Sequence, residues 1–255
     1  MKKFKGIYPA LITPFDEKGR INPEMVQQVV DSCLAKGVSG FYVGGSTGES
    51  YLLSLEERRE MLEHVVKAVD GRSDVIANIG VFATEQGIEL AKHAEELGVD
   101  AISSVPPFYF PFSLEEYVQY YNDLADSVNV PVIIYNIPAM SGITFKTADI
   151  ERFFENEKII GMKHTSYDLF QLERVIKKYP EKNVFCGHDE LFLSASAVGV
   201  KAGIGSTFNF MAEKFVKIQK LLAENNWAEA AIIQDEANAV IEELCKIGVF
   251  KGVKA

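Results

Sequence analysis

The sequence predicts a (β/α)8 TIM barrel, and two observations lead to it: the length of the chain and a repeated βα pattern. At 255 residues, the chain matches the roughly 250 residues typical of this fold. Along it, a short β-branched run, a polar loop, a capped helix and then a glycine recur about eight times. Eight near-regular units favour a closed barrel over the runner-up, an open doubly wound sheet.

The expected strands are short segments rich in β-branched and aromatic residues, each followed by small or polar residues. They cover residues 6–12, 41–43, 75–79, 101–105, 130–135, 159–163, 184–186 and 202–204. Because the active site of such a barrel lies among the loops that follow the carboxyl ends of its strands, those loops are where functional residues are sought.

Several helices begin at residues that cap free backbone N–H groups. Asn22 precedes Pro23 at a first helical position, capping boxes begin at Ser54 and Ser113, and Asp168 begins a looser version. The first helix also carries an apolar stripe that should pack outside the sheet, made of Met25, Val26, Val29, Val30, Cys33 and Leu34.

After the eighth strand, the chain runs through two expected helices, 212–224 and 227–247. No low-complexity linker divides it. We therefore expect a catalytic barrel core over residues 1–210 and C-terminal helices over residues 211–255 packed on the barrel, all within a single domain.

The composition argues against several classes of partner. With 47% hydrophobic and 24% charged residues, the chain has enough apolar surface for a globular core. A net charge of -10 and the absence of any Lys/Arg run argue against binding to nucleic acid or an anionic membrane. The longest uncharged stretch, 127–145, contains two prolines and two asparagines, so no membrane span is expected.

The cysteines and histidines predict neither a disulfide framework nor a metal site. Cys33, Cys186 and Cys245 are odd in number and widely spaced, which fits a reducing cytoplasm. Prolines early in the chain interrupt any signal-peptide core, so export is not expected. The four histidines lack metal-ligand spacing, and His64 and His93 fall on expected helices. We expect no metal and no cofactor.

Polar segments follow several expected strands. Segment 44–49 is glycine-rich and predicts either an anion-binding nest for a carboxylate or a plain turn. Tyr135 ends strand five and is either a proton relay or a core tyrosine. Asp189 and Glu190 follow strand seven. They either accept hydrogen bonds from a polyhydroxylated ligand or are acidic residues in the first turn of a helix. Segment 203–209 lacks the third glycine of a dinucleotide loop, so NAD is not expected and a phosphate site is the better alternative.

Lys163 closes the short apolar run 159–163, where a cation needs an explanation. Lysines are seldom fully buried unless they are paired, so the position predicts either a salt bridge or a reactive amine. A neutral amine attacks a ketone, and the resulting iminium acts as an electron sink that allows a carbon–carbon bond to break. This is the chemistry of a class I aldolase.

The chain resembles the pyruvate-dependent class I aldolase family that includes dihydrodipicolinate synthase and N-acetylneuraminate lyase. Nearly the whole chain is covered. The resemblance lies in four segments that follow the family's order and spacing: GGSTGE from Gly44, YNIPAMSG from Tyr135, GMKHTS from Gly161 and GIGSTFN from Gly203.

The resemblance implies roles for particular residues. Lys163 would form the Schiff base with pyruvate, Ser46 and Thr47 would hold the pyruvyl carboxylate, and Tyr135 would shuttle a proton to and from the aldehyde-side hydroxyl. Family members are tetramers, and Tyr109 matches a tyrosine that reaches into a neighbouring subunit's site and extends a Ser46–Tyr135 hydroxyl relay. Tyr109 is alternatively an interface aromatic.

The resemblance also bears on the substrate. Met140 stands where the synthase pattern has an arginine for a second carboxylate, so a synthase is disfavoured. The residues implied to bind sugar hydroxyls are Thr165, Gly187, Asp189, Glu190 and Ser206. The implied reaction is the reversible cleavage of N-acetylneuraminate, a sialic acid, to N-acetylmannosamine and pyruvate.

Two alternative functions remain open, and the chain departs from the family pattern at one point. The alternatives are an aldolase acting on another 2-keto-3-deoxy sugar acid and a non-catalytic barrel that binds sugar acids. Family members continue with further C-terminal helices after the segment that matches 248–252, so the chain resembles a shortened member whose tetramer and activity are in question.

Overall fold

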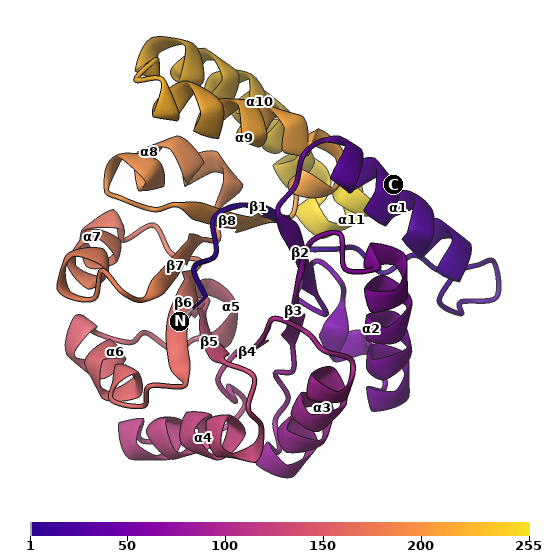
Figure 1. Ribbon diagram of the computed structural model, residues 1–255, viewed down its shortest axis with the longest axis vertical. Coiled ribbons are helices and arrows are strands. Elements are labelled where there is room, and N and C mark those ends of the chain that lie inside the picture. Colours follow the sequence, from indigo (N-terminus) through magenta and orange to yellow (C-terminus); the bar gives the residue numbers. More distant parts are fainter. Residues whose placement is uncertain (1) are drawn as a thin grey trace.

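The computed structural model describes residues 2–255 and has the predicted barrel architecture (Figure 1). Eight parallel strands form one sheet in the order β1-β8-β7-β6-β5-β4-β3-β2. The barrel is nearly closed: between β1 and β2, the Leu11 N–H donates to the Tyr42 carbonyl at 2.9 Å. The strands are β1 (Gly6–Pro9), β2 (Gly40–Val43), β3 (Asp74–Asn78), β4 (Ala101–Ser104), β5 (Val132–Asn136), β6 (Ile159–His164), β7 (Asn183–Cys186) and β8 (Ala202–Gly205).

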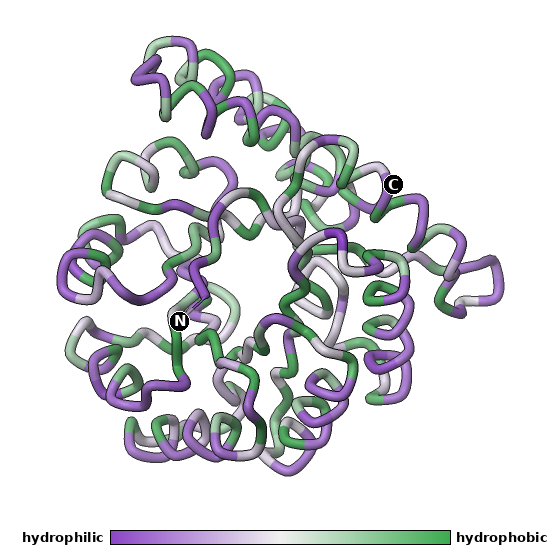
Figure 2. The backbone as a smooth tube through the Cα atoms, viewed as in Figure 1, coloured by the Kyte–Doolittle hydropathy of each residue, from purple (hydrophilic) through white to green (hydrophobic). Residues whose placement is uncertain are grey.

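Helices surround the ring of strands in Figure 1 and carry both hydrophilic and hydrophobic residues (Figure 2). They are α1 (Pro23–Ala35), α2 (Leu55–Val69), α3 (Thr84–Glu96), α4 (Leu114–Ser127), α5 (Pro138–Ser141), α6 (Thr147–Phe154), α7 (Leu169–Lys178), α8 (Phe192–Ala197), α9 (Phe208–Ala223), α10 (Trp227–Ile247) and α11 (Val249–Lys254), with 3-10 turns η1 (Ser50–Leu52) and η2 (Asp189–Leu191).

The helix starts predicted from capping residues in the sequence are confirmed. The Asn22 side chain accepts hydrogen bonds from the N–H groups of Glu24 and Met25. Ser54 and Ser113 each form a complete capping box, and the Asp168 carboxylate accepts from the Gln171 N–H. These caps satisfy N–H groups that have no partner within the helix.

Some expected boundaries were wrong. β1 ends at Pro9 rather than at residue 12. Ala10 and Leu11 still donate to carbonyls of β8 and β2, but the Ile12 N–H donates to the Asn209 side chain at 3.1 Å. β5 begins after Pro131, which has no N–H to give to the sheet. Met25 is 43% exposed and does not belong to the packing stripe of α1.

The C-terminal region also differs in detail from the expectation. α9 begins at Phe208, earlier than expected, and bends at Met211, whose φ of -127° and ψ of 33° are not helical. α10 occupies the expected residues, and α11 is an additional short helix. α10 packs along both α9 and α11, and this arrangement brings the C-terminal residues to one wall of the cavity described below.

The core has two layers separated by the sheet. Side chains that point into the barrel form one layer, which includes Tyr8, Tyr42, Ile133, Tyr135, Phe185 and Ile204. The larger layer lies between the strands and the surrounding helices. Because successive strand residues face opposite sides, the same strands fill the barrel and bind the helices.

Candidate active site

A cavity of about 260 Å³ lies at the carboxyl ends of the strands. Its wall contains every site residue expected from the sequence except Tyr109: Ser46, Thr47, Tyr135, Lys163, Thr165, Gly187, Asp189, Glu190 and Ser206. These residues come from the ends of β2, β5, β6, β7 and β8 and the loops that follow, so barrel closure brings together segments that are far apart in the sequence.

Lys163 lies near the end of β6 and is 4% exposed. Its Nζ is 3.9 Å from the ring centroid of Tyr135 and 4.8 Å from that of Tyr42. Among residues 2–255, no carboxylate lies within 4.0 Å of this nitrogen. The salt-bridge alternative is therefore not observed, and the amine lies beside the rings of Tyr42 and Tyr135 at the cavity wall.

Tyr42 supports this arrangement and was not recognised from the sequence. Its ring packs edge-on against Tyr135 at 5.8 Å between centroids, and its hydroxyl donates to the Ser103 Oγ at 3.1 Å. Complete burial raises the pKa of Tyr42 well above its usual value. Tyr42 is thus a neutral hydrogen-bonding support beneath the lysine, and its inward position on the expected second strand was the available signal.

The loop after β2 presents both hydroxyls and backbone N–H groups. The Thr47 Oγ1 and the Ser206 Oγ lie 2.8 Å apart and link this loop to the one after β8. Gly44 has a φ of +72°, a conformation that favours glycine. The N–H groups of Ser46 and Thr47 donate to no acceptor in residues 2–255, so they remain available for a ligand.

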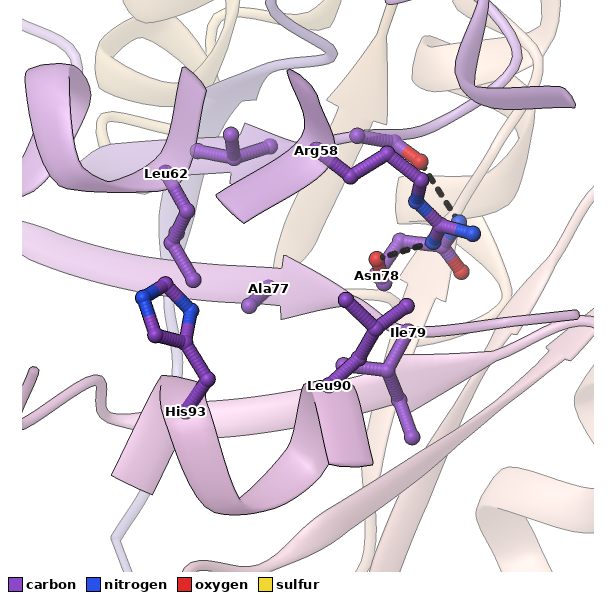
Figure 3. Close-up of a pocket in the computed structure, with 9 residues that line it drawn as sticks. Arg58, Leu62, Ala77, Asn78, Ile79, Leu90 and His93 are labelled. Carbon is purple, nitrogen blue, oxygen red and sulfur yellow. Dashed lines mark hydrogen bonds between the residues drawn. The ribbon is translucent and has the colours of Figure 1, made fainter. Parts of the chain in front are cut away.

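A buried arginine holds the start of this loop in place (Figure 3). The Arg58 guanidinium donates to the carbonyls of Asn78 and Gly80, each at 2.8 Å. The Asn78 side chain in turn donates to the Gly44 carbonyl at 2.6 Å. Arg58 was missed because it stands in the charged run EERRE, which is typical of an exposed helix face.

Thr165 packs directly against the backbone of Gly187. A Cβ at Gly187 would lie 1.9 Å from the Thr165 Oγ1, so only glycine leaves room for this hydroxyl. The same Oγ1 is buried and has no hydrogen-bond partner in residues 2–255. A buried hydroxyl without a partner costs free energy unless a ligand or water satisfies it.

Two neighbouring carboxyl groups at η2 have different environments. Asp189 is buried, and its Oδ2 accepts from both the N–H and the Oγ1 of Thr207, at 2.8 and 2.7 Å. Burial raises the pKa of Asp189 to about 6, although the bonds from Thr207 oppose that shift. Glu190 is partly exposed, and hydrogen bonding lowers its pKa despite its burial, with His188 as the main donor.

Tyr109 does not line this cavity. It is 74% exposed, and its ring packs against those of Phe82 and Phe110. Together with the exposed Leu52, which lines a cavity with Phe82, they form an exposed apolar cluster. A second cavity, of about 510 Å³, lies beside this cluster and shares Ser46 with the first. Met140 lines both cavities and is 56% exposed.

The C-terminal helices complete the wall of the first cavity, which sequence reasoning did not anticipate. Ile241 and Cys245 of α10, and Val249 and Phe250 of α11, face it. Within residues 2–255, no cluster of three His, Cys, Asp or Glu side chains is arranged to hold a metal. None of the helices in this part of the chain has the length and apolar character needed to cross a membrane.

The fold and the site define a TIM-barrel enzyme, with polar and ionisable groups gathered at the carboxyl ends of the strands. A family model described as the dihydrodipicolinate synthetase family matches residues 3–255. The chain belongs to this family.

Known relatives agree with that assignment. An N-acetylneuraminate lyase of Citrobacter koseri is 40% identical, over 99% of this chain and 86% of the relative. A Clostridium difficile protein, CdNal, solved in complex with mannosamine, superposes with a TM-score of 0.96 at 38% identity, over 99% of this chain and 88% of that one. An N-acetylneuraminate lyase of Fusobacterium nucleatum complexed with pyruvate has a TM-score of 0.93 at 36% identity, over 98% and 84%.

Proposed function

We propose that the chain is a class I carbon–carbon lyase that cleaves N-acetylneuraminate reversibly to N-acetylmannosamine and pyruvate. The observation that carries the proposal is Lys163, an amine buried at the cavity wall with no carboxylate within 4.0 Å among residues 2–255. The similarity to N-acetylneuraminate lyases over nearly the whole chain supports the choice of substrate.

In the proposed reaction, the Lys163 Nζ attacks the C2 ketone of the open-chain sugar acid, and loss of water gives an iminium. Tyr135, whose ring centroid is 3.9 Å from this nitrogen, passes its own phenol proton into the hydroxyl relay with Ser46 and takes the proton of the C4 hydroxyl. The C3–C4 bond then breaks, and its electron pair moves into the iminium to leave an enamine. N-acetylmannosamine departs as the aldehyde, and protonation at C3 and addition of water release pyruvate.

The keto-acid carboxylate fits the loop after β2. The free N–H groups of Ser46 and Thr47 point to an anion-binding role, and the Ser46 and Thr47 hydroxyls add further donors. This assignment needs no basic side chain, which agrees with the acidic composition of the chain. Ser46 would also join Tyr135 in a hydroxyl relay.

The sugar part of the substrate would lie against the part of the wall formed by Thr165, Gly187, Asp189, Glu190 and Ser206, the last of which adjoins Thr47. The unpartnered Thr165 hydroxyl and the two carboxyl groups are suited to hydrogen bonds with sugar hydroxyls. Met140 offers no charge to a second carboxylate, which disfavours a dicarboxylate product.

The experiment that tests this proposal is reduction with borohydride in the presence of pyruvate, followed by peptide mass analysis. We expect an adduct on Lys163, and none in a Lys163→Arg variant. Lys182 is the matched control, because it is a partly buried lysine whose pKa burial lowers, yet it precedes β7 at the opposite end of the barrel. Folded protein without an adduct on Lys163, or with one on Lys182 instead, would contradict the mechanism.

A separate measurement tests the choice of substrate. Turnover of N-acetylneuraminate is compared with that of shorter 2-keto-3-deoxy sugar acids. A clear preference for N-acetylneuraminate is expected, and equal or better turnover of another acid would identify the chain as a different pyruvate aldolase. A protein that binds these acids without turnover, and without an adduct, would be a non-catalytic sugar-acid-binding barrel.

The assembly and cellular compartment are part of the same proposal. A homotetramer, with Tyr109 reaching the site of a neighbouring subunit, would cover the exposed cluster of Leu52, Phe82, Tyr109 and Phe110. The three cysteines are free, as is usual for proteins of a reducing cytoplasm.

A further inference from the structure

Tyr167 and His188 form a stacked aromatic pair at the rim of the cavity. Their ring centroids are 4.5 Å apart and the ring planes differ by 21°. Both residues line the cavity, although Tyr167 follows β6 and His188 follows β7. Tyr167 is 70% exposed, so burial of its ring in the core does not explain its position.

Both members of the pair contact the same atom. The Tyr167 hydroxyl donates to the Glu190 Oε1 at 3.1 Å, and the His188 Nδ1 lies 3.1 Å from that oxygen. Two contacts from different strand ends fix the orientation of one carboxylate. The Glu190 Oε2 receives no side-chain hydrogen bond in residues 2–255, so it remains free to accept one from a ligand in the cavity.

The charges around the pair indicate which chemical groups a ligand at this wall would carry. Glu190 has a lowered pKa and is ionised near neutral pH, so it accepts hydrogen bonds and donates none. Asp189 lies beside it, and Cys245 of α10 faces Tyr167. A neutral group with several hydroxyls suits this wall, whereas a second carboxylate would be repelled.

We infer that Tyr167 and His188 are positioning residues that orient Glu190 toward the hydroxyls of the sugar part of the substrate and thereby help to select a polyhydroxylated chain. This inference rests on the proposed lyase function. In this inference neither residue takes part in breaking the C3–C4 bond. Each acts through Glu190, and the stack with His188 keeps the Tyr167 hydroxyl within reach.

The decisive variant is Tyr167→Phe, which removes the hydroxyl and keeps the stacking ring. A hydrogen bond to a charged group is typically worth a factor of about ten or more, so kcat/KM for N-acetylneuraminate should fall about tenfold, mainly through KM. Pyruvate binding and turnover of a 2-keto-3-deoxy acid too short to reach Glu190 should be unchanged. Tyr179→Phe, at the opposite end of the barrel, is the matched control and should behave as wild type.

A double-mutant cycle separates positioning from a general structural effect. In a Glu190→Gln background, Tyr167→Phe should have little further effect, because the two changes act on one interaction. His188→Asn, which keeps a side-chain N–H, should retain more activity than His188→Ala. If Tyr167→Phe leaves kcat/KM unchanged, or lowers it equally with and without Glu190→Gln, the inference is wrong.

A readout that does not depend on turnover distinguishes the inference from the proposed function. Titration of the Glu190 carboxyl by 13C NMR should give a higher pKa in Tyr167→Phe than in wild type, since a donor to the carboxylate is lost. If the Glu190 pKa rises in Tyr167→Phe but the wild-type protein does not cleave N-acetylneuraminate, the positioning of Glu190 is supported. The lyase function and the proposed selectivity are then overturned. No shift would overturn the positioning itself.

Discussion

At the residue scale, the site contains two adjacent carboxyl groups, Asp189 and Glu190, whose pKa values are shifted in opposite directions. Asp189 is enclosed next to Thr207 and Gly205, where an added Cβ would lie 2.0 Å from the Asp189 Oδ1. Glu190 remains partly exposed and receives donors from two side chains. Burial dominates for Asp189, and hydrogen bonding dominates for Glu190.

The raised pKa of Asp189 has a consequence for stability. A carboxyl group whose folded-state pKa, here about 6, exceeds its unfolded value of about 4 stabilises the fold fully at low pH. That contribution is lost as pH rises through about 6. Relative to Asp189→Asn, the wild-type protein should therefore lose about 2 kcal/mol of unfolding free energy between pH 4 and 7, since one pKa unit corresponds to about 1.4 kcal/mol and the unfolded carboxyl is already half ionised near pH 4.

Urea denaturation of both proteins across this pH range measures the difference. Glu190→Gln is the matched control: the lowered pKa of Glu190 gives stability that is lost only as pH falls below its ordinary value of 4.5, so the difference between wild type and this variant should change little between about pH 5 and 7. A difference between wild type and Asp189→Asn that stays constant from pH 4 to 7 would contradict the prediction.

At the scale of elements, helix α2 fixes the loop that presents Ser46 and Thr47. Arg58 on this helix is 7% exposed and bonds to carbonyls at the end of β3, while Asn78 connects β3 to Gly44. Arg58 and Asn78 (Figure 3) therefore connect α2 and β3 to Gly44, which begins the loop of the proposed carboxylate site.

We expect Arg58→Met to destabilise the protein by about 2 to 4 kcal/mol, because two buried carbonyls lose charged donors. The affinity for pyruvate should fall as well, since the loop loses its support. Denaturation and the pyruvate dependence of borohydride trapping measure the two effects. Arg59→Met is the control: Arg59 pairs with Glu89 at the surface, and its loss should cost less than about 1 kcal/mol. Equal effects of the two variants would refute the assigned role.

At the scale of the whole molecule, the exposed cluster of Leu52, Phe82, Tyr109 and Phe110 lies beside the cavities rather than at random on the surface. Leu52 is 82% exposed, and η1, which contains it, follows directly after the loop with Ser46 and Thr47. An assembly formed through this cluster would therefore link subunit contacts to the shape of the site.

Leu52→Glu should shift the protein to a smaller assembly, because it places charge in the expected interface. Sedimentation velocity measures the size, and activity at a fixed subunit concentration shows whether the assembly supports catalysis. Ile232→Glu is the matched control, since Ile232 is 61% exposed on α10 away from this cluster. A wild-type protein that sediments as a monomer would exclude the tetramer.

Much of the local structure and most of the site were determined by the sequence itself. The caps at Asn22, Ser54 and Ser113 act within a few residues, and the glycine-rich and polar strand ends are contiguous motifs, so both can be recognised without tertiary contacts. Lys163 was recognisable because a cation closes an apolar strand.

The tertiary structure alone decided how these residues are surrounded. Lys163 lies beside the rings of Tyr42 and Tyr135 with no carboxylate within 4.0 Å, and Arg58 is buried; both depend on contacts between residues distant in sequence. The same is true of Tyr167 and His188, whose shared contact with Glu190 exists because barrel closure places β6 beside β7. Pattern and propensity act locally, whereas burial, charge and orientation at the site depend on the closed barrel.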